Sequence, residues 1–442
     1  MGTETAAPVG ALRLTESLRL WAEAERLIPG GSQTNSKRAG AFALGAYPIY
    51  AARAAGCRIW DVDGNEYLDF VSALGPVSLG YGHPAVDDAI REQLGRGIIS
   101  GLLWPVEVEV ARGLLEALPG AAAGTPRAVR FFKGGGEGTA AAARIARAHT
   151  GRHVILNAGY RGWPDVWAAG RDPAVPAELA AYVLAFPHDD LVALRRLLEA
   201  NAGKVAAVFM DLPYSGPLPE GHLAAVRDLA HAHGAVFATD EIVSGFRLAV
   251  GGGAAYCGVE PDLAVFAKGM ANGMPLAAVA GRAEVMAAGE RSLISLTYGG
   301  EALSLAAAAA VLRVYREQDV IGHLWTVGRR LMDGLNAAAR AAGVPFRCTG
   351  YPPMSAMHLD VPPEAVAPAW HTLLAGCARR GVLLRRGGLN FVTLAHTAAD
   401  VDAAVAVCAA AFGDLRAAGY EGAPASTPVP VGDRGRGQQV GV

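Results

Sequence analysis

Short apolar runs alternate with amphipathic stretches from about residue 128 onwards. The runs VRFF, HVILN, VAAVFMD and AVFATD are apolar almost throughout and rich in Val, Phe and Ala, as strands covered on both faces of a sheet are. The stretches between such runs, among them EGTAAAARIARAH and HLAAVRDLAHAHG, have the spacing of helices. Repeated strand–helix units predict an open, mostly parallel α/β sheet with right-handed crossovers, to which DLAVFAK and LAAVAG add further strands.

The chain before this region has a different pattern. Residues 12–27 are amphipathic and predict a helix that ends at Pro29-Gly30-Gly31. Two short runs, CRIWDV and EYLDF, flank Asp63-Gly64-Asn65, which is typical of a β-hairpin. We expect further helices near 84–96 and 106–118.

The chain after this region begins with a long helical stretch. Residues 302–342 have helical spacing, and 350–415 then alternate again as a smaller α+β unit. The last residues, from Gly422 onwards, are rich in Gly, Pro and polar side chains, so we predict that this tail is disordered.

Length and composition exclude several classes of protein. The 442 residues are 52% hydrophobic, which is too apolar for a disordered chain, and five cysteines are too few for a disulfide scaffold. A formal net charge of −2 argues against a nucleic-acid partner, which requires an excess of Lys and Arg. No run of about 18 apolar residues predicts a membrane span, and no secretory signal is visible. We therefore expect a cytoplasmic protein with reduced thiols and no membrane or nucleic-acid partner.

Candidate chemistry gathers where the predicted parallel strands end, which is the edge at which open α/β sheets bind ligands. A glycine-rich turn, 133–138, follows VRFF; Tyr160 and Arg161 follow HVILN; Asp240 follows AVFAT; and Lys268 follows DLAVFA. Each has an ordinary interpretation as a tight connection, a core aromatic, a helix cap or a surface lysine. A lysine that ends an apolar strand is costly to bury, however, and a desolvated lysine becomes a nucleophilic amine.

Together these residues match the needs of pyridoxal 5′-phosphate (PLP). Glycines at a helix N-terminus let backbone N–H groups approach a phosphate. PLP also needs a lysine for its Schiff base and an acidic residue for its pyridinium nitrogen. The sequence contains neither an H-E-x-x-H nor a G-x-S-x-G motif, so we expect no metal site and no serine nucleophile of that kind.

The chain resembles the class III PLP-dependent aminotransferases of fold type I, especially the branch that contains glutamate-1-semialdehyde aminomutase. The resemblance rests on blocks in order over about residues 25–415: PGG at 29–31, GCRIWDVDGNEYLDF at 56–70, LGYGHP at 79–84, the glycine turn at 133–138, GYRGW at 159–163, TDEIVSGFR at 239–247, AKGMANGMPL at 267–276 and TYGGEALSLAA at 297–307. It implies a large domain with a mostly parallel seven-stranded sheet flanked by helices, and a smaller α+β domain built from both ends of the chain. We expect these boundaries: 1–75 for the N-terminal segment of the small domain, 76–325 for the large PLP-binding domain, 326–418 for the C-terminal small domain and 419–442 for a disordered tail.

The resemblance also implies roles for individual residues. Lys268 would be the Schiff-base lysine and Asp240 the partner of the pyridine nitrogen. Ile242 and Tyr160 would pack on opposite faces of the cofactor ring. The turn would cradle the phosphate, and Thr297 would reach the phosphate of the cofactor in the neighbouring subunit, which implies a homodimer with shared active sites. The phosphate cradle would consist of Gly135, Gly136 and the helix N-terminus that begins at Glu137.

Three departures from the family pattern bear on the function. Gly136 stands where a hydroxyl residue is usual, which removes a hydrogen bond to phosphate of about 1.5–3 kcal/mol. Arg161 replaces the usual histidine; it would either act beside the cofactor or turn to solvent. Glu301, in a GGEAL block where Gly-Asn-Pro is common, resembles a sub-branch that acts on amino sugars and aminoglycoside antibiotics; it would either meet a cationic amine or change the packing of its loop.

These observations predict an aminotransferase for a small-molecule amine or carbonyl substrate. The expected reaction moves an amino group between a donor, L-glutamate, and a polar carbonyl compound such as an amino sugar or an aminoglycoside antibiotic intermediate. Elimination, epimerisation or aminomutation on a similar substrate are the alternatives, because the same cofactor supports all of them. A non-catalytic relative that binds a ligand or partner is a third hypothesis, against which the presence of Lys268 and Asp240 argues.

Overall fold

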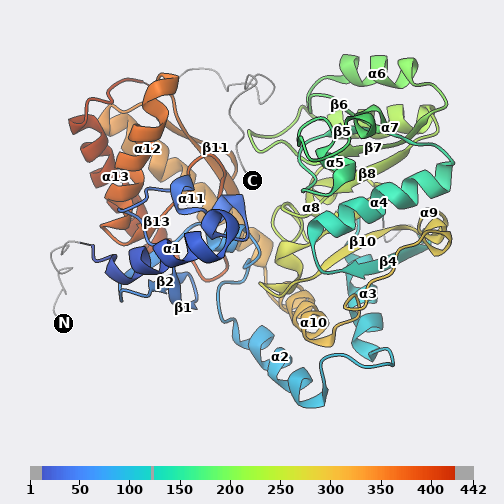
Figure 1. The fold of residues 1–442 in the computed structure, drawn as a ribbon, viewed down its shortest axis with the longest axis horizontal. Helices are drawn as coiled ribbons and strands as arrows, with labels where there is room; N and C mark the ends of the chain where they lie inside the picture. Colours follow the sequence, from blue (N-terminus) through green and yellow to red (C-terminus); the bar gives the residue numbers. More distant parts are fainter. Residues whose placement is uncertain (1–11, 121–123, 424–442) are drawn as a thin grey trace. The chain divides into compact units, whose positions relative to one another are not determined.

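The computed structural model describes residues 12–120 and 124–423, and the chain divides into two compact units (Figure 1). Unit 1 consists of Met1–Leu74, Gly80–Gly82 and His323–Val442, and unit 2 of Gly75–Leu79 and His83–Gly322. Most of the predicted disordered tail, from 424 onwards, lies outside the described residues.

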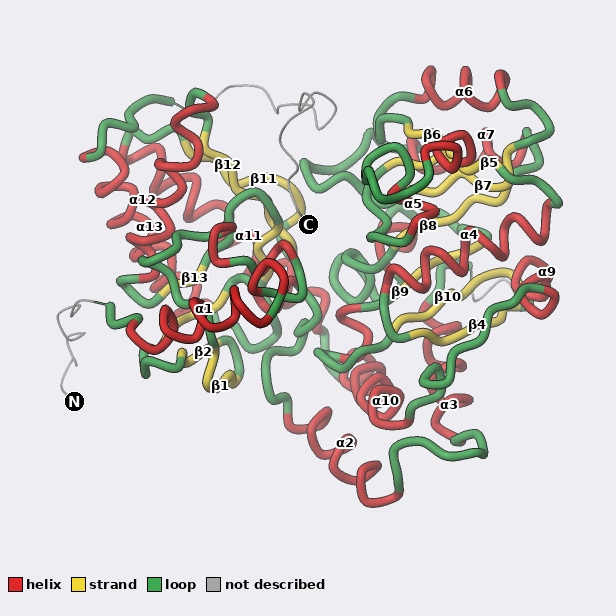
Figure 2. Tube along the Cα trace, in the orientation of Figure 1, coloured by secondary structure: helices red, strands yellow, loops and turns green. Residues whose placement is uncertain are grey.

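Unit 2 contains a seven-stranded sheet with the strand order β4-β10-β9-β8-β7-β5-β6. Strand β10 is antiparallel to both of its neighbours, and the other pairs are parallel, which confirms the mostly parallel α/β sheet. Figure 2 shows the strands of this sheet in yellow and the helices in red. The short strand β6 was not predicted, because its three residues carry no pattern of their own. The strands are β4 Arg127–Phe132, β5 Val154–Ala158, β6 Val183–Ala185, β7 Val205–Met210, β8 Val236–Asp240, β9 Leu263–Phe266 and β10 Ala277–Arg282.

Apolar side chains explain why these strands lie inside the unit. Every residue of β5, β7, β8 and β9 is buried, as a sheet covered on both faces requires. Helix α4 packs on this sheet through small side chains: a Cβ at Gly138 would lie 2.8 Å from Val265 on β9. The helices of unit 2 that precede α10 are α2 Pro84–Arg96, α3 Pro105–Ala117, α4 Gly135–Thr150, α5 Asp165–Ala168, α6 Leu191–Ala200, α7 His222–Ala232, α8 Gly252–Tyr256 and α9 Ala283–Met286.

The helical stretch predicted over 302–342 is two helices rather than one. Helix α10 covers Ala302–Glu317 and α11 covers Val320–Ala342. The unit boundary falls within α11, after Gly322. Asp319 marks the break, since its carboxylate accepts a hydrogen bond of 2.9 Å from the Gly322 N–H in the first turn of α11.

Unit 1 contains two small sheets, β1-β2-β3-β13 and β11-β12-β14. The predicted hairpin is confirmed, because β2 and β3 pair antiparallel around Asp63-Gly64-Asn65. Strand β1 was not predicted: its residues AARAA are mostly exposed and lack the β-branched side chains typical of strands. The elements are α1 Thr15–Leu27, β1 Ala51–Ala55, β2 Arg58–Asp61, β3 Glu66–Asp69, β11 Phe346–Tyr351, β12 Met354–Leu359, α12 Val366–Ala378, β13 Val382–Leu383, β14 Leu389–Phe391 and α13 Ala398–Ala417.

Candidate active site

The register of three neighbouring strands brings two carboxylates to one edge of the sheet. Ala158 on β5 pairs with Met210 on β7, and Met210 pairs with Thr239 on β8. Asp211 directly follows β7, and Asp240 is the last residue of β8, so both lie in the same row at the carboxyl edge. This is the edge where an open parallel sheet binds its ligands.

Asp240 is a buried carboxylate at the end of β8. Its Oδ1 accepts a hydrogen bond of 3.0 Å from the Ile242 N–H, and its Oδ2 lies 3.4 Å from the Arg161 guanidinium. Burial raises the pKa of Asp240 to about 6, and the nearby Asp211 carboxylate adds to the rise while Arg161 opposes it. The carboxylate is therefore mostly ionised at neutral pH despite being buried.

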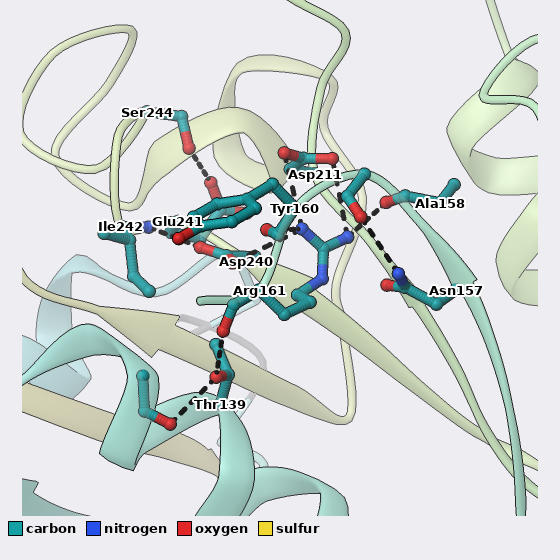
Figure 3. Close-up of polar contacts among 12 residues, drawn as sticks. Thr139, Asn157, Ala158, Tyr160, Arg161, Asp211, Asp240, Glu241, Ile242 and Ser244 are labelled. Carbon is teal, nitrogen blue, oxygen red and sulfur yellow. Dashed lines mark hydrogen bonds and ion pairs between the residues drawn. The ribbon is translucent and has the colours of Figure 1, made fainter. Parts of the chain in front are cut away.

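Arg161 points into the protein and lies between the two carboxylates (Figure 3). Its side chain is fully buried, and Nη1 lies 3.3 Å from Asp211 and 3.4 Å from Asp240. The guanidinium also donates to the carbonyl oxygens of Ala158 and Tyr160, and it lies 5.4 Å from the ring of Phe209. Burial alone would lower the pKa of Arg161, but the two carboxylates raise it overall. The alternative of an arginine turned to solvent is therefore wrong.

The Asp211 carboxylate was not singled out from the sequence. Besides its contact with Arg161, Asp211 accepts a hydrogen bond of 2.7 Å from His188 Nε2. Burial would raise the pKa of Asp211, but Arg161 and His188 lower it overall. Gly159 makes room for this carboxylate: its φ is +104°, and a Cβ there would collide with Asp211. An aspartate directly after an apolar strand was the signal that could have pointed to it.

The glycine-rich turn connects β4 to α4. The helix begins at Gly135, two residues before the predicted start at Glu137. The Glu137 carboxylate accepts hydrogen bonds from the N–H groups of Lys133 and Gly134, at 2.9 Å and 3.0 Å, and so caps its own helix. The first N–H groups of a helix have no partner inside the helix, which makes this turn suited to an anion.

Both predicted cradle glycines are closely covered by neighbouring side chains. A Cβ at Gly135 would lie 2.7 Å from Ile242, and one at Gly136 would lie 3.3 Å from Pro164. Thr139, which sequence reasoning missed, donates from its hydroxyl to the carbonyl oxygens of Gly136 and Arg161, at 3.0 Å and 2.8 Å. The turn is thereby joined to the loop after β5. That loop also carries Tyr160, which is 43% exposed.

Lys268 follows β9, the strand next to β8. Asp240 pairs with Val265 on β9, so Lys268 lies three residues beyond the Asp240 row at the same edge. Lys268 is half-buried and has a φ of +47°, a left-handed conformation that is uncommon for a residue other than glycine. Such conformations persist where the surrounding structure imposes them, which is frequent at functional sites.

The loop before α10 holds the other two predicted residues. Thr297 is exposed and lines a pocket of about 540 Å³ together with Leu103, Trp104 and Phe131. Glu301 is the N-cap of α10 and lies 2.8 Å from the Lys133 ammonium. The cationic amine that Glu301 meets in this structure is therefore that of Lys133, and its other role is to cap a helix.

Two further observations concern metal binding and membrane insertion. Among residues 12–120 and 124–423, no group of three or more His, Cys, Asp and Glu side chains could hold a metal ion. Within the same residues, no helix has both the length and the apolar character needed to cross a bilayer.

Comparisons with known proteins identify the family of the chain. The family model described as Aminotransferase class-III matches residues 41–163 and 191–412. The chain is 35% identical over 347 residues to a glutamate-1-semialdehyde 2,1-aminomutase of Syntrophobacter fumaroxidans, covering 74% of this chain and 78% of that protein. It is 33% identical over 350 residues to a 3-aminobutyryl-CoA aminotransferase of Cloacimonas acidaminovorans, covering 77% of this chain and 83% of that protein.

Solved structures show the same fold. The FumI protein of Sphingopyxis sp. MTA144, solved with PLP, has a TM-score of 0.86 and 27% identity, covering 94% of this chain and 99% of that chain. An omega-transaminase of Sphaerobacter thermophilus has a TM-score of 0.79 and 27% identity, covering 90% of this chain and 98% of that chain. These similarities confirm the predicted fold type I architecture.

Proposed function

Because the chain belongs to the class-III aminotransferase family of PLP-dependent enzymes, we propose that it transfers an amino group from L-glutamate to a polar carbonyl compound, an amino sugar or an aminoglycoside intermediate. The observation that carries this proposal is the shared edge of the sheet. Buried Asp240 ends β8, Lys268 follows the adjacent β9, and the glycine turn opens α4.

These residues fit PLP in three separate respects. The turn offers backbone N–H groups to an anion; a Cβ at Gly135 would lie only 2.7 Å from Ile242, whereas one at Gly136 would need Pro164 to give way slightly. Asp240 is an ionised carboxylate in a buried place, suited to a protonated ring nitrogen. Lys268 supplies a primary amine at the same edge. Tyr160 and Ile242 would hold the two ring faces.

Each residue then has a defined task in the transfer. Bound PLP supplies an electron-withdrawing ring that stabilises negative charge on the substrate carbon. Asp240 would keep the ring nitrogen protonated. Lys268 would hold the cofactor through its amine, and the same amine, when free, would serve as the base that moves a proton at the substrate carbon. The turn would hold the phosphate end, and Thr139 joins this turn to the loop after β5.

The substrate class is supported by the GGEAL block and by an exposed aromatic side chain near the turn. Trp163, on the loop after β5, is 83% exposed, and a flat aromatic face suits the apolar face of a sugar ring. Glu301 does not contribute to this recognition, because its carboxylate is engaged by Lys133 and by the N-terminus of α10.

We also propose that the enzyme is a homodimer in which Thr297 reaches the partner's cofactor phosphate. The support is an apolar surface beside Thr297: Leu102 and Leu103, which line the same pocket as Thr297, are 81% and 85% exposed. Apolar side chains that gather on a surface mark protein interfaces. The variant Leu103→Glu is expected to lower the molar mass in light scattering from dimer to monomer, whereas a monomeric wild type would refute the proposal.

A cytoplasmic location is proposed from the cysteines. All five are free, and Cys377 and Cys408 remain unbonded although their sulfur atoms are 3.9 Å apart and buried. Thiols that lie so close together stay reduced in a reducing compartment.

Aminomutation is the second candidate function. It is favoured because a relative named an aminomutase is as similar to the chain as one named an aminotransferase, at 35% and 33% identity. Elimination and epimerisation use the same groups.

The deciding experiment follows the visible spectrum of the holoenzyme during addition of L-glutamate, with 2-oxoglutarate assayed in the same sample. Loss of the cofactor's visible band with one equivalent of 2-oxoglutarate supports amino transfer. The variant Asp240→Asn is the matched control, since it keeps Lys268 and removes the carboxylate. An unchanged band without 2-oxoglutarate, and the same result with L-alanine, would refute transfer and favour aminomutation or elimination.

A further inference from the structure

Three charged groups meet at the end of β8, and their charges do not cancel. The Arg161 guanidinium lies 3.3 Å from Asp211 and 3.4 Å from Asp240, and all three side chains are at least nine-tenths buried. One cation between two carboxylates leaves a net charge of −1. These three groups by themselves therefore carry one negative charge in excess next to the proposed ring nitrogen, and His188, whose Nε2 lies 2.7 Å from Asp211, is the further titratable group in contact with them.

Each member of this cluster requires the other two. Without Arg161, two buried carboxylates would face each other, and one of them would take up a proton. Without Asp211, the guanidinium would pair with Asp240 alone and neutralise it. Removing one partner of a buried ion pair leaves an uncompensated charge, so the cluster is sensitive to single changes.

We propose that Arg161 and Asp211 are a compensated pair of positioning residues: Arg161 keeps Asp240 ionised, and Asp211 keeps Arg161 from neutralising it. The inference rests on the proposed function, in which Asp240 faces the ring nitrogen of PLP. Arg161 is then not a ligand of the phosphate, because its guanidinium is directed at the two carboxylates. Its own backbone carbonyl accepts from Thr139, which fixes the loop.

The loop geometry holds the guanidinium in this place. Arg161 donates to the carbonyl oxygen of Ala158, on the preceding strand, and to that of Tyr160, in its own loop. These two hydrogen bonds fix the orientation of the guanidinium. Gly159 leaves space for the Asp211 carboxylate. A histidine at position 161 could hydrogen-bond to Asp240 but would bring no fixed charge, and Asp211 would then lack its cation.

The other titratable groups around Asp240 act on the same carboxylate. Glu241, the next residue, raises the pKa of Asp240 through its charge. Glu241 is itself engaged by the Ser244 hydroxyl and by the N–H groups of Gly253 and Ala254. Tyr214, after β7, lies near Asp211 and Asp240, and burial raises its pKa, so it stays neutral. Arg161 lowers the pKa of Asp240 through its charge, and His188, 2.7 Å from Asp211, is the titratable group on the other side of that carboxylate.

The test measures how pH affects binding of 4′-deoxypyridoxine 5′-phosphate to the apoprotein. This probe keeps the ring nitrogen and the phosphate but has no aldehyde for Lys268. Its dissociation constant is measured by fluorescence from pH 5 to 9 for wild type, R161Q, D211N and R161Q/D211N. The phosphate and the ring nitrogen of the probe also titrate in this range, so D240N, which has no titrating group at position 240, is measured in parallel, and a midpoint that D240N lacks reports on Asp240.

The two single variants are expected to move the midpoint in opposite directions. R161Q removes a cation, so the pH below which binding weakens rises by about 1–3 units. D211N removes an anion, so that midpoint falls. The double variant leaves one carboxylate without either neighbour and is expected to return towards wild type. A purely structural role would move the affinity of all three variants at every pH without this change of sign.

The control is R152Q, which removes a half-buried arginine at the opposite end of β5 that donates to the carbonyl oxygens of Val205, His233 and Gly234. It is expected to leave the midpoint unchanged. If R161Q does not fold, D211N and R161K still test the ion-pair inference. D211N must lower the pH midpoint of probe binding, and R161K, which keeps the positive charge, must have a midpoint within about 1 pH unit of wild type. Midpoints of R161Q and D211N that move together, or not at all, overturn the proposal.

D240N separates this inference from the proposed function. If D240N binds the probe like wild type at every pH, Asp240 does not face the ring nitrogen, and both the proposed function of Asp240 and the ion-pair inference fail. If D240N weakens binding and removes the midpoint while R161Q leaves it in place, the proposed function stands and the ion-pair inference alone fails.

Discussion

Replacing Glu301 by alanine distinguishes a structural carboxylate from one that recognises substrate. Glu301 accepts hydrogen bonds from the N–H groups of Leu303 and Ser304, at 2.6 Å and 3.2 Å, and from the Ser304 hydroxyl at 2.6 Å. It also accepts one of 2.8 Å from Lys133. Burial would raise the pKa of Glu301, but these partners lower it overall.

The size of the effect follows from these contacts. Loss of an N-cap costs about 0.5–2 kcal/mol. The Lys133–Glu301 pair adds about 1 kcal/mol, near the upper end for exposed pairs, because both side chains are mostly covered, with exposed fractions of 18% and 11%. We expect Glu301→Ala to lower the free energy of unfolding by about 1.5–3 kcal/mol. Glu301→Gln keeps an acceptor for the helix and should lose about 1 kcal/mol.

The assay is urea unfolding of the apoprotein at pH 7.5 and one protein concentration. A double-mutant cycle of Glu301→Gln with Lys133→Met isolates the ion pair, and its coupling energy should be about 1 kcal/mol. The same variants are assayed for KM with a cationic amine substrate, which should change less than twofold. An unchanged free energy of unfolding together with a rise of KM above tenfold would refute this reasoning. Glu301 would then be a residue that binds the substrate.

Three further predictions concern the sheet edge. Lys268→Ala should abolish the covalent cofactor adduct, measured by mass spectrometry of borohydride-treated holoenzyme, while far-ultraviolet circular dichroism stays unchanged; an adduct in the variant would place the reactive lysine elsewhere. Gly159→Ala should destabilise the apoprotein by more than about 1 kcal/mol in urea, because of its positive φ and the collision with Asp211, whereas Gly151→Ala, where nothing lies close, should lose only the backbone cost. Asp240 has a folded-state pKa raised to about 6, so the native state binds the extra proton and wild-type stability falls as pH rises from about 4 to about 6. The apoprotein of Asp240→Asn should lack this decrease of stability in thermal melts from pH 4 to 8. If wild type and variant show parallel curves of melting temperature against pH, the raised pKa of Asp240 is contradicted.

The sequence was informative wherever a local pattern decides the structure. Apolar runs located the strands, and since parallel strands end at one edge, the sequence pattern was enough to place Asp240 and Lys268 together. The start of α4 at Gly135 was missed by two residues because glycine has a low helix propensity, and here the Glu137 carboxylate caps the turn. The ion pair of Glu301 is formed with Lys133, which is 168 residues away in the chain. No local sequence pattern predicts a contact at that separation.

The cluster around Arg161 could not be predicted from local sequence patterns either, because its members are far apart in the chain. Arg161 and Asp211 are 50 residues apart, and they meet because β5 and β7 are neighbours in a register that aligns Ala158 with Met210. Sequence alone left Arg161 open between solvent and the cofactor. Strand order and register, which long-range packing sets, exclude the solvent alternative.

The departures at Gly136 and Arg161 are physically connected through one loop. A Cβ at Gly136 would press on Pro164, and one at Gly162 would lie 3.3 Å from the Gly136 Cα, so the loop after β5 lies directly on the turn. Thr139 hydrogen-bonds to the carbonyls of both Gly136 and Arg161 and locks the two segments together. A side chain at 136 would therefore need Pro164 to shift by a few tenths of an ångström, and Thr139 joins that segment to the loop that carries Arg161. We therefore expect the effects of substitutions at positions 136 and 161 to be coupled, because both positions belong to the same packed contact between turn and loop.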